Sequence, residues 1–92
     1  MRLRWTPDAR RSLAAIRSDW NQLSRGAGTR AGKRIVASTR HLRRFPESGR
    51  VVPEYGVETV REIIEDPFRV WYVIESRYVT VIAVFHAARD TR

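Results

Sequence analysis

The chain has 92 residues, which is enough for a single domain over residues 1–92 and too short for two. Its hydrophobic share of 42% and aromatic share of 10% exclude a disordered tail or a collagen-like fibre, and the lack of cysteine excludes disulfides, thiolate zinc sites and a cysteine nucleophile. The formal net charge of +8 is uneven, because residues 1–50 carry 13 basic and 3 acidic side chains whereas residues 51–92 carry 5 and 7.

No apolar run approaches the ~18 residues of a membrane span, and the opening residues lack the apolar core of a signal peptide. With His41 and His86 as the only histidines, a histidine-rich metal site is excluded as well. We expect a cytoplasmic domain with no cofactor, no metal and no membrane contact. The arginines of the first half suggest a polyanionic or acidic partner, although a preference for arginine codons would give the same excess.

A short strand over residues 2–5 and an amphipathic helix over residues 7–23 are predicted first. Thr6 provides an N-cap hydroxyl, Pro7 suits the first helical position, and Asp8 lies where the helix dipole favours an acid. One apolar stripe follows at helical spacing: Ala9, Leu13, Ile16, Trp20 and Leu23. The opposite face carries Arg10, Arg11, Arg17 and Asp19.

A second helix is predicted from near Thr29, a suitable N-cap, to Phe45, because Pro46 disfavours helical geometry in the residue before it. Its inner stripe is Ala31, Ile35, Ser38 or Thr39, Leu42 and Phe45. Most of the remaining surface is basic: Arg30, Lys33, Arg34, Arg40, Arg43 and Arg44. The short connection predicts an antiparallel hairpin, and a sheet must cover its two apolar stripes.

The second half of the chain predicts that sheet. Residues 51 and 52 begin a short strand. Pro53 has no main-chain N–H to donate to a neighbouring strand, which favours a position at the edge of the sheet. Three β-rich runs follow at 59–65, 68–75 and 78–86, and the last is apolar on both faces, so we expect it to be central. The predicted fold class is α+β: a short N-terminal strand and an antiparallel two-helix hairpin packed on a small, mostly antiparallel sheet.

Five short phrases occur in order along nearly the whole chain. They are Trp5-Thr6-Pro7 with Ala9 and Leu13; Leu42-x-x-Phe45-Pro46-x-x-Gly49-Arg50; Val60-Arg61-Glu62; Phe68-Arg69-Val70 with Tyr72; and His86-x-x-Arg89-Asp90. Together they resemble the RelE/ParE superfamily of bacterial type II toxins, and its ParE branch in particular. The resemblance implies a toxin that is neutralised by a cognate antitoxin encoded beside it, in a hetero-oligomer of the two proteins.

The two branches of the superfamily act differently. In the ParE branch the target is DNA gyrase, which is poisoned by protein–protein contact without chemistry on the part of the toxin. In the RelE branch the target is mRNA on the ribosome, which is cleaved by attack of a 2′-hydroxyl on the adjacent phosphate. One fold hosts both activities, so the site must distinguish them.

RNA cleavage needs a base, an acid and fixed cations around the phosphate. The candidates for these roles are Arg61, Glu62, Arg69, His86 and Arg89, assisted by Tyr72. A purely structural interpretation stands beside each: an ion pair for Arg61 and Glu62, a structural histidine for His86, and protection of a sheet face for Arg69.

The features that a resemblance to the RNA-cleaving branch would imply are missing. Members of that branch are expected to carry a cluster of lysines and arginines in the sheet, followed by an aromatic residue near the C-terminus. Here the sheet half has no lysine and a net negative charge, and no aromatic residue follows His86. We therefore favour a ParE-type inhibitor of DNA gyrase, with a RelE-type ribosome-dependent mRNA endoribonuclease as the alternative.

Contacts with the antitoxin or the target are expected from arginines and aromatic residues. The candidates are Arg10, Arg11, Arg17, Arg40, Arg43, Arg44, Arg89, Trp20, Trp71 and Tyr78. The helical arginines equally fit a solvated face, and the aromatic residues equally fit plain core packing. A DNA-binding module is excluded, because no recognition helix with a base-reading Asn or Gln is visible.

Overall fold

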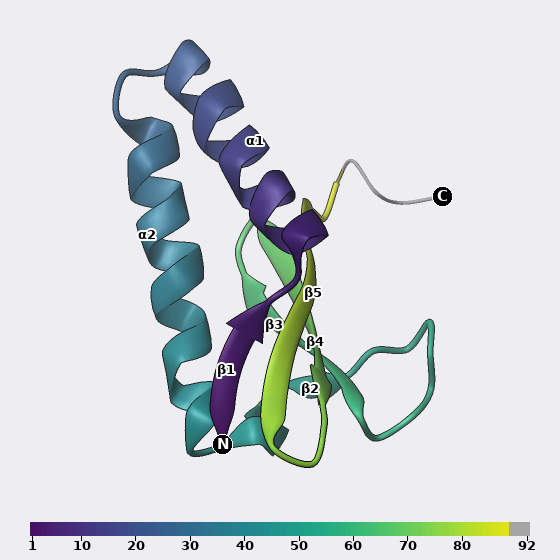
Figure 1. Ribbon diagram of the computed structural model, residues 1–92. Coiled ribbons are helices and arrows are strands. Elements are labelled where there is room, and N and C mark those ends of the chain that lie inside the picture. Colours follow the sequence, from purple (N-terminus) through teal and green to yellow (C-terminus); the bar gives the residue numbers. More distant parts are fainter. Residues whose placement is uncertain (89–92) are drawn as a thin grey trace.

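The computed structural model describes residues 1–88, which form two layers: a helical hairpin and a five-stranded sheet (Figure 1). In chain order the elements are β1 (Arg2–Trp5), α1 (Pro7–Leu23), α2 (Ala27–Thr39), the 3₁₀ turns η1 (Arg40–Arg43) and η2 (Pro46–Ser48), β2 (Arg50–Val51), β3 (Val60–Glu65), β4 (Phe68–Ile74) and β5 (Tyr78–His86). The predicted α+β class is confirmed. Within residues 1–88, no helix combines the length and the apolar character needed to cross a membrane.

Helix α1 begins as its sequence predicts. The Thr6 hydroxyl accepts a hydrogen bond from the Ala9 amide at 3.1 Å, and Pro7 and Asp8 occupy the first turn. Ala9 and Leu13 are buried, and Ile16 and Trp20 pack at the rim of the core. Leu23 was expected on the same stripe but is 80% exposed. The hairpin extends past the end of the sheet at this point (Figure 1), so the last turn of α1 has no sheet beneath it.

Helix α2 differs from its prediction at both ends. It starts at Ala27, two residues before Thr29, and its N-cap is Gly26, whose φ of 80° favours glycine. Asn21 of α1 provides the hydrogen-bond acceptor for the first turn of α2, because its Oδ1 accepts hydrogen bonds from the amides of Gly28 (2.7 Å) and Thr29 (3.2 Å). The two helices are close at Gly28, where a Cβ atom would lie 1.8 Å from the carbonyl oxygen of Arg17.

The C-terminal end of α2 corrects the predicted inner stripe. Regular α-helix ends at Thr39, and the chain continues as the 3₁₀ turn η1 instead of reaching Phe45. A 3₁₀ turn rotates the chain further per residue than an α-helix, so the later positions leave the predicted face. Leu42 remains fully buried, whereas Phe45 is 61% exposed. The prediction that Phe45 is a core residue is wrong.

The strand order of the sheet is β1-β5-β4-β3-β2. All pairs are antiparallel except β1 with β5, which agrees with a mostly antiparallel sheet. Strand β5 is interior, as expected from its two apolar faces, but β4 holds the middle position. The two-residue strand β2 lies at an edge, which agrees with the effect expected of Pro53.

The hydrophobic core lies between the hairpin and one face of the sheet. Its buried members come from α1, α2, η1, β4 and β5: Ala9, Leu13, Ala31, Ile35, Leu42, Phe68, Val70, Tyr72, Val79, Val81 and Val84. Because side chains alternate along a strand, the intervening residues of β4, Arg69 and Trp71, lie on the opposite face. The helices therefore cover one face of the sheet and leave the other bare (Figure 1).

Two substitutions test whether the 3₁₀ turn η1 buries Leu42 and leaves Phe45 at the surface. Leu42→Ala should lower the free energy of unfolding by about 2–5 kcal/mol, because it truncates a fully buried side chain. Phe45→Ala should change it by no more than about 0.5 kcal/mol, because the ring is mostly exposed. Urea denaturation of the two variants measures both values, and equal losses would contradict the arrangement of η1.

Candidate functional site

The structure separates the residues proposed for RNA cleavage. Arg61 pairs across the sheet with Tyr72, whose side chain lies on the helix-covered face, whereas Glu62 and Arg69 lie on the bare face. His86 pairs with Phe68 at the end of β5, again on the covered face. Arg89 lies outside the described residues. Among the described candidates, Glu62 and Arg69 are the only two whose side chains are joined by a hydrogen bond or an ion pair.

Arg61 holds the segment before β2 in place. Its guanidinium donates to the carbonyl oxygens of Glu47 (3.2 Å), Gly49 (3.0 Å) and Glu58 (2.9 Å) and pairs with the Glu58 carboxylate at 2.6 Å. With 12% of its side chain exposed, Arg61 has its donors directed at the protein rather than at solvent. These contacts fit the structural interpretation of this arginine.

His86 has an equally structural environment. Its ring packs against Phe68 at 5.9 Å and Trp20 at 6.4 Å between centroids, and its Nδ1 accepts a hydrogen bond from the Ala88 amide at 3.1 Å. Trp20 itself stacks on Phe68 at 5.0 Å, so both aromatic candidates of this region contribute to the rim of the core.

Glu62 is the centre of a network on the bare face. Its side chain has no exposure, and its carboxylate accepts hydrogen bonds from Arg50 Nε, Arg69 Nε (2.6 Å) and Trp71 Nε1 (2.9 Å). Arg69 also binds Glu54 with Nη1 and Nη2 at 3.1 and 3.3 Å. The network joins strands β2, β3 and β4 to the loop that follows β2.

The electrostatics of the network keep Glu62 ionised. Burial alone would raise the pKa of the Glu62 carboxyl, but the hydrogen bonds from Arg69, Arg50 and Trp71 outweigh it and hold that pKa below its usual value. The pKa of Arg69 is raised, chiefly by its bonds to Glu62 and Glu54. An enclosed, ionised carboxylate whose oxygens are already engaged by cations is poorly suited to take a proton from a bound substrate.

The phrase Pro46-x-x-Gly49 has a clear structural role next to this network. The Tyr72 hydroxyl donates to the carbonyl oxygen of Pro46 at 2.6 Å and accepts from the Gly49 amide at 2.9 Å. A Cβ atom at Gly49 would lie 2.5 Å from both the Tyr72 hydroxyl and the carbonyl oxygen of Glu62. The phrase therefore fixes the entry into β2 and with it the position of Arg50.

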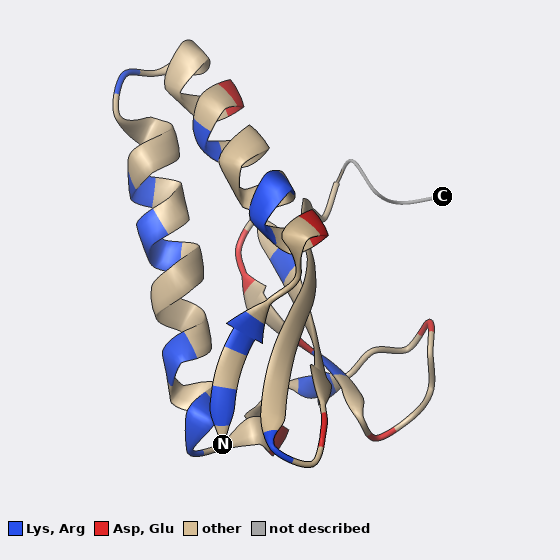
Figure 2. Cartoon of the chain, in the orientation of Figure 1, with Lys and Arg blue, Asp and Glu red and all other residues tan. Residues whose placement is uncertain are grey.

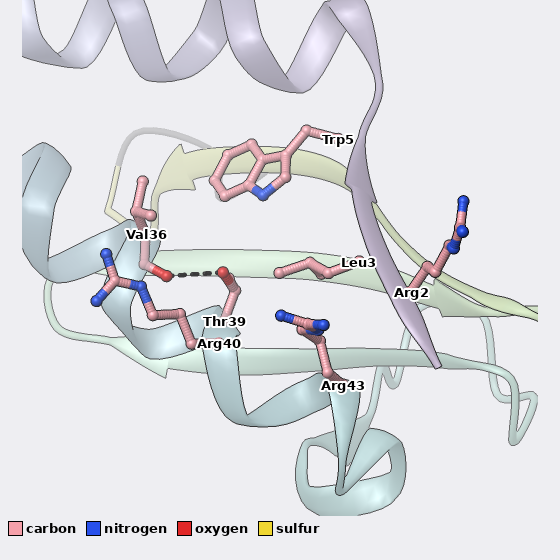
Figure 3. Close-up of a pocket in the computed structure, with 7 residues that line it drawn as sticks. All are labelled: Arg2, Leu3, Trp5, Val36, Thr39, Arg40 and Arg43. Carbon is pink, nitrogen blue, oxygen red and sulfur yellow. Dashed lines mark hydrogen bonds between the residues drawn. The ribbon is translucent and has the colours of Figure 1, made fainter.

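The opposite edge of the sheet has a different surface, a basic groove between β1 and α2 (Figure 3). A hollow of about 470 Å³ is lined by Arg2, Leu3, Trp5, Val36, Thr39, Arg40 and Arg43. A second hollow of about 440 Å³ continues it along the helices and is lined by Arg17, Lys33, Val36, Ala37 and Arg40. We call these two hollows together the basic groove.

Among the described residues, the cations of the basic groove have no acidic partners. Arg2, Arg17, Lys33, Arg40 and Arg43 form no ion pair within residues 1–88, although seven ion-pair contacts occur elsewhere in that range. Basic residues follow one another along α2, η1 and β1 (Figure 2). The groove thus combines an apolar floor of Leu3, Trp5 and Val36 with uncompensated positive charge.

Strand β1 adds an open main-chain edge to the groove. The amides of Arg2 and Thr6 donate to the carbonyl oxygens of Arg77 and Val81, at 3.0 Å each, on the side of β5. Alternate residues of a strand direct their main-chain groups to opposite sides. The amides and carbonyl groups of Leu3 and Trp5 therefore face outward, beside the groove.

The remaining predicted binding residues are dispersed. Arg44 borders the groove with the N-terminus, whereas Arg10 and Arg11 lie at the start of α1, where Arg11 pairs with Asp8. The guanidinium carbon of Arg4 lies over the ring of Tyr78, 3.9 Å from the ring centroid. Trp71 belongs to the Glu62 network. The groove's apolar floor was missed, although the alternation of Arg2, Leu3, Arg4 and Trp5 already placed Leu3 and Trp5 on one face.

A family model and a solved structure both relate this chain to ParDE toxin–antitoxin systems. A family model described as the ParE toxin of the type II toxin–antitoxin system parDE matches residues 3–91. A solved structure described as the chromosomal ParDE toxin–antitoxin system from P. aeruginosa superposes with a TM-score of 0.79 and 24% sequence identity, covering 94% of this chain and 95% of the other. No curated protein matched by sequence.

The Glu62 network makes stability depend on pH in a specific way. The folded-state pKa of Glu62 is lowered, so its stabilisation is present above the unfolded pKa and is lost as the pH falls through the folded pKa. Glu62→Gln should lower the free energy of unfolding at pH 7 by about 1.5–3 kcal/mol. It should also flatten, without abolishing, the loss of stability as the pH falls below about 5, because Glu54 and Glu75 also have lowered pKa values.

Urea denaturation at a series of pH values measures both effects. Leu23→Ala, a substitution at an exposed side chain far from the network, is the control. An identical acid slope for the wild type and Glu62→Gln would contradict the network's electrostatics.

Proposed function

The chain belongs to the ParE toxin family of type II toxin–antitoxin systems, and from that premise we propose that it inhibits DNA gyrase by protein–protein contact. We propose also that its cognate antitoxin neutralises it by occupying the basic groove. Both proposed partners act in the cytoplasm, which is where we place the toxin. The toxin and antitoxin then form a hetero-oligomer.

The separation of the nuclease candidates is the observation that carries the proposal of a contact toxin. Arg61 and His86 are engaged in structural contacts on the covered face, and the carboxylate of Glu62 is enclosed by cations on the bare face. RNA cleavage requires an acid, a base and phosphate-binding cations around one reacting phosphate. The described residues do not provide that arrangement, whereas inhibition by contact needs only a complementary surface.

The basic groove has the features of a binding site for an acidic and apolar protein segment. Its arginines, which form no ion pair within residues 1–88, match carboxylates, which guanidinium groups bind through two parallel hydrogen bonds. Its floor offers Trp5 as an aromatic anchor beside Leu3 and Val36. The outward main-chain groups of β1 allow an extended segment to bind by strand addition as well.

The two kinds of contact should contribute differently to the affinity of the antitoxin. An exposed ion pair contributes only about 0–1 kcal/mol, whereas truncation of a well-packed aromatic anchor costs 2 kcal/mol or more. Charges mainly accelerate association, because they attract the partner before contact. The arginines of the groove should therefore set the association rate and the apolar floor the dissociation rate.

The proposed target is tested with the purified protein in two assays. We expect inhibition of gyrase supercoiling with accumulation of cleaved DNA, and no cleavage of mRNA on translating ribosomes. Addition of the antitoxin should abolish the inhibition. Cuts within codons of ribosome-bound mRNA, with gyrase unaffected, would assign the protein to the RelE type of activity instead.

The proposed antitoxin site is tested by binding kinetics. The double substitution Arg40→Gln with Arg43→Gln should slow association about tenfold and change dissociation by no more than about threefold. Trp5→Ala should accelerate dissociation about tenfold or more, and Val36→Ala serves in its place if that variant melts early. The double substitution Arg25→Gln with Arg30→Gln, at exposed positions that do not line the groove, removes the same two charges and is the control. A dissociation rate that rises by orders of magnitude in the arginine variant would make the charges the main source of affinity.

A further inference from the structure

The bare face of the sheet carries a second ordered surface, at the edge opposite the basic groove. Arg50, Glu62 and Trp71 are neighbours in one row across β2, β3 and β4, as their cross-strand pairing shows. Strand β1, which borders the groove, and strand β2, which carries Arg50, are the two outer strands of the sheet. A partner at Arg50 would therefore leave the basic groove open.

Arg50 is held in place by Glu62, but its guanidinium keeps hydrogen-bond donors available for a partner. Its Nε donates to the enclosed carboxylate of Glu62, while 61% of its side chain is exposed. Within residues 1–88, its two Nη groups donate no hydrogen bond. Arg69, by contrast, is engaged by both Glu62 and Glu54. The outer side of the Arg50 guanidinium thus presents two N–H donors in a fixed orientation, which is the geometry that binds a carboxylate.

Two isoleucines line a hollow beside this guanidinium. A hollow of about 320 Å³ beside it is lined by Arg50, Gly49, Ile63 and Ile64 together with His41, Ser48 and Glu62. Ile64 is 52% exposed, although it is a large apolar residue in a strand.

Further along the face, the rings form an ordered series. Tyr55 contacts Trp71 edge-on at 5.5 Å, and Trp71 contacts Phe85 edge-on at 5.0 Å. Tyr55 comes from the loop after β2 and is more than half exposed. Tyrosine, tryptophan and arginine are the residue types that contribute most to protein interfaces.

The charge around Arg50 favours a protein over a nucleic acid. Arg50 and Arg69 are balanced by Glu54 and Glu62, so the centre of this surface has no net charge. Binding to a phosphate backbone depends on an excess of cations. A single oriented guanidinium within an apolar and aromatic surface fits one carboxylate flanked by apolar side chains.

We propose that this surface, centred on Arg50 and Tyr55, is the site at which the toxin contacts its target protein, through an acidic side chain of the target bound to the Arg50 guanidinium. The inference rests on the proposed contact mechanism and goes beyond it in naming the surface and the chemistry of the partner. The antitoxin in the basic groove and the target at Arg50 then bind at opposite edges of the sheet.

Substitutions at the two positions test the site, with growth arrest as the first measurement. Expressed in bacteria, Arg50→Gln and Tyr55→Ala should abolish growth arrest, and Arg50→Lys should weaken it, because an ammonium group keeps the charge but not the paired donors. Arg25→Gln and Leu23→Ala, at exposed positions on the hairpin, should arrest growth like the wild type. Thermal melts and unchanged affinity for the antitoxin establish that the variants fold.

The second measurement is affinity for gyrase holoenzyme without DNA. Arg50→Gln and Tyr55→Ala should each weaken it about tenfold or more. Growth arrest by both variants at wild-type strength would overturn the proposal. So would an Arg50-dependent affinity that appears only when gyrase carries DNA, because the guanidinium would then bind a phosphate.

The two proposals fail in different ways. Growth arrest by the wild type without binding to gyrase would refute gyrase as the target, while loss of arrest in the Arg50 and Tyr55 variants would still support the site. A wild-type protein that folds and does not arrest growth would overturn both.

Discussion

The helical hairpin covers only one face of the five-stranded sheet, and the other features of the molecule depend on this constraint. On the covered face, burial of apolar side chains from both helices and from strands β4 and β5 provides the core, and partly buried residues of β1 and β3 pack against it. The bare face has no such layer, yet it contains a side chain with no exposure, the carboxylate of Glu62. A buried charge is tolerated only when it is paired and hydrogen-bonded, and here Arg50, Arg69 and Trp71 meet that requirement. The hydrogen bonds to this one carboxylate thereby position Arg50, Arg69 and Trp71 on the bare face.

This architecture separates the two surfaces that we propose as binding sites for partners. The groove at β1 combines free cations with an apolar floor and an open strand edge, which suits a flexible acidic segment. The surface at β2 is aromatic and electrically balanced, with one half-exposed guanidinium held by Glu62. Neither place brings together the groups needed for acid–base catalysis. Two contact surfaces on a small sheet are what the proposed function requires, one for the target and one for the antitoxin.

Much of the fold could be predicted from the sequence because its signals are local. The Thr6-Pro7-Asp8 cap, the stripe from Ala9 to Trp20 and the alternation in β5 each reflect one element, and each was placed correctly. Phe45 was misplaced because a change from α-helix to 3₁₀ turn within an apolar pattern leaves no local mark. Leu23 was misplaced because periodicity does not tell where the sheet beneath a helix ends.

The candidate sites could be predicted only in part, since they are built from residues distant in sequence. Glu62 and Arg69 were singled out, but their partnership with Arg50, Trp71 and Glu54 depends on strand order and register. The same applies to the groove, where Trp5 of β1 meets Arg40 of η1 across the two layers. Composition indicated basic helices, and only the fold shows which of their cations lack an acidic partner within residues 1–88.

The most direct test of two separate contact surfaces is hydrogen–deuterium exchange of the toxin alone, with its antitoxin and with its target. The antitoxin should protect the outward amides of Leu3 and Trp5 and the segment 33–43, and leave residues 50–64 unchanged. The target should protect residues 50–64 and leave Leu3 and Trp5 unchanged. Protection of one common set of amides by both partners would contradict the account.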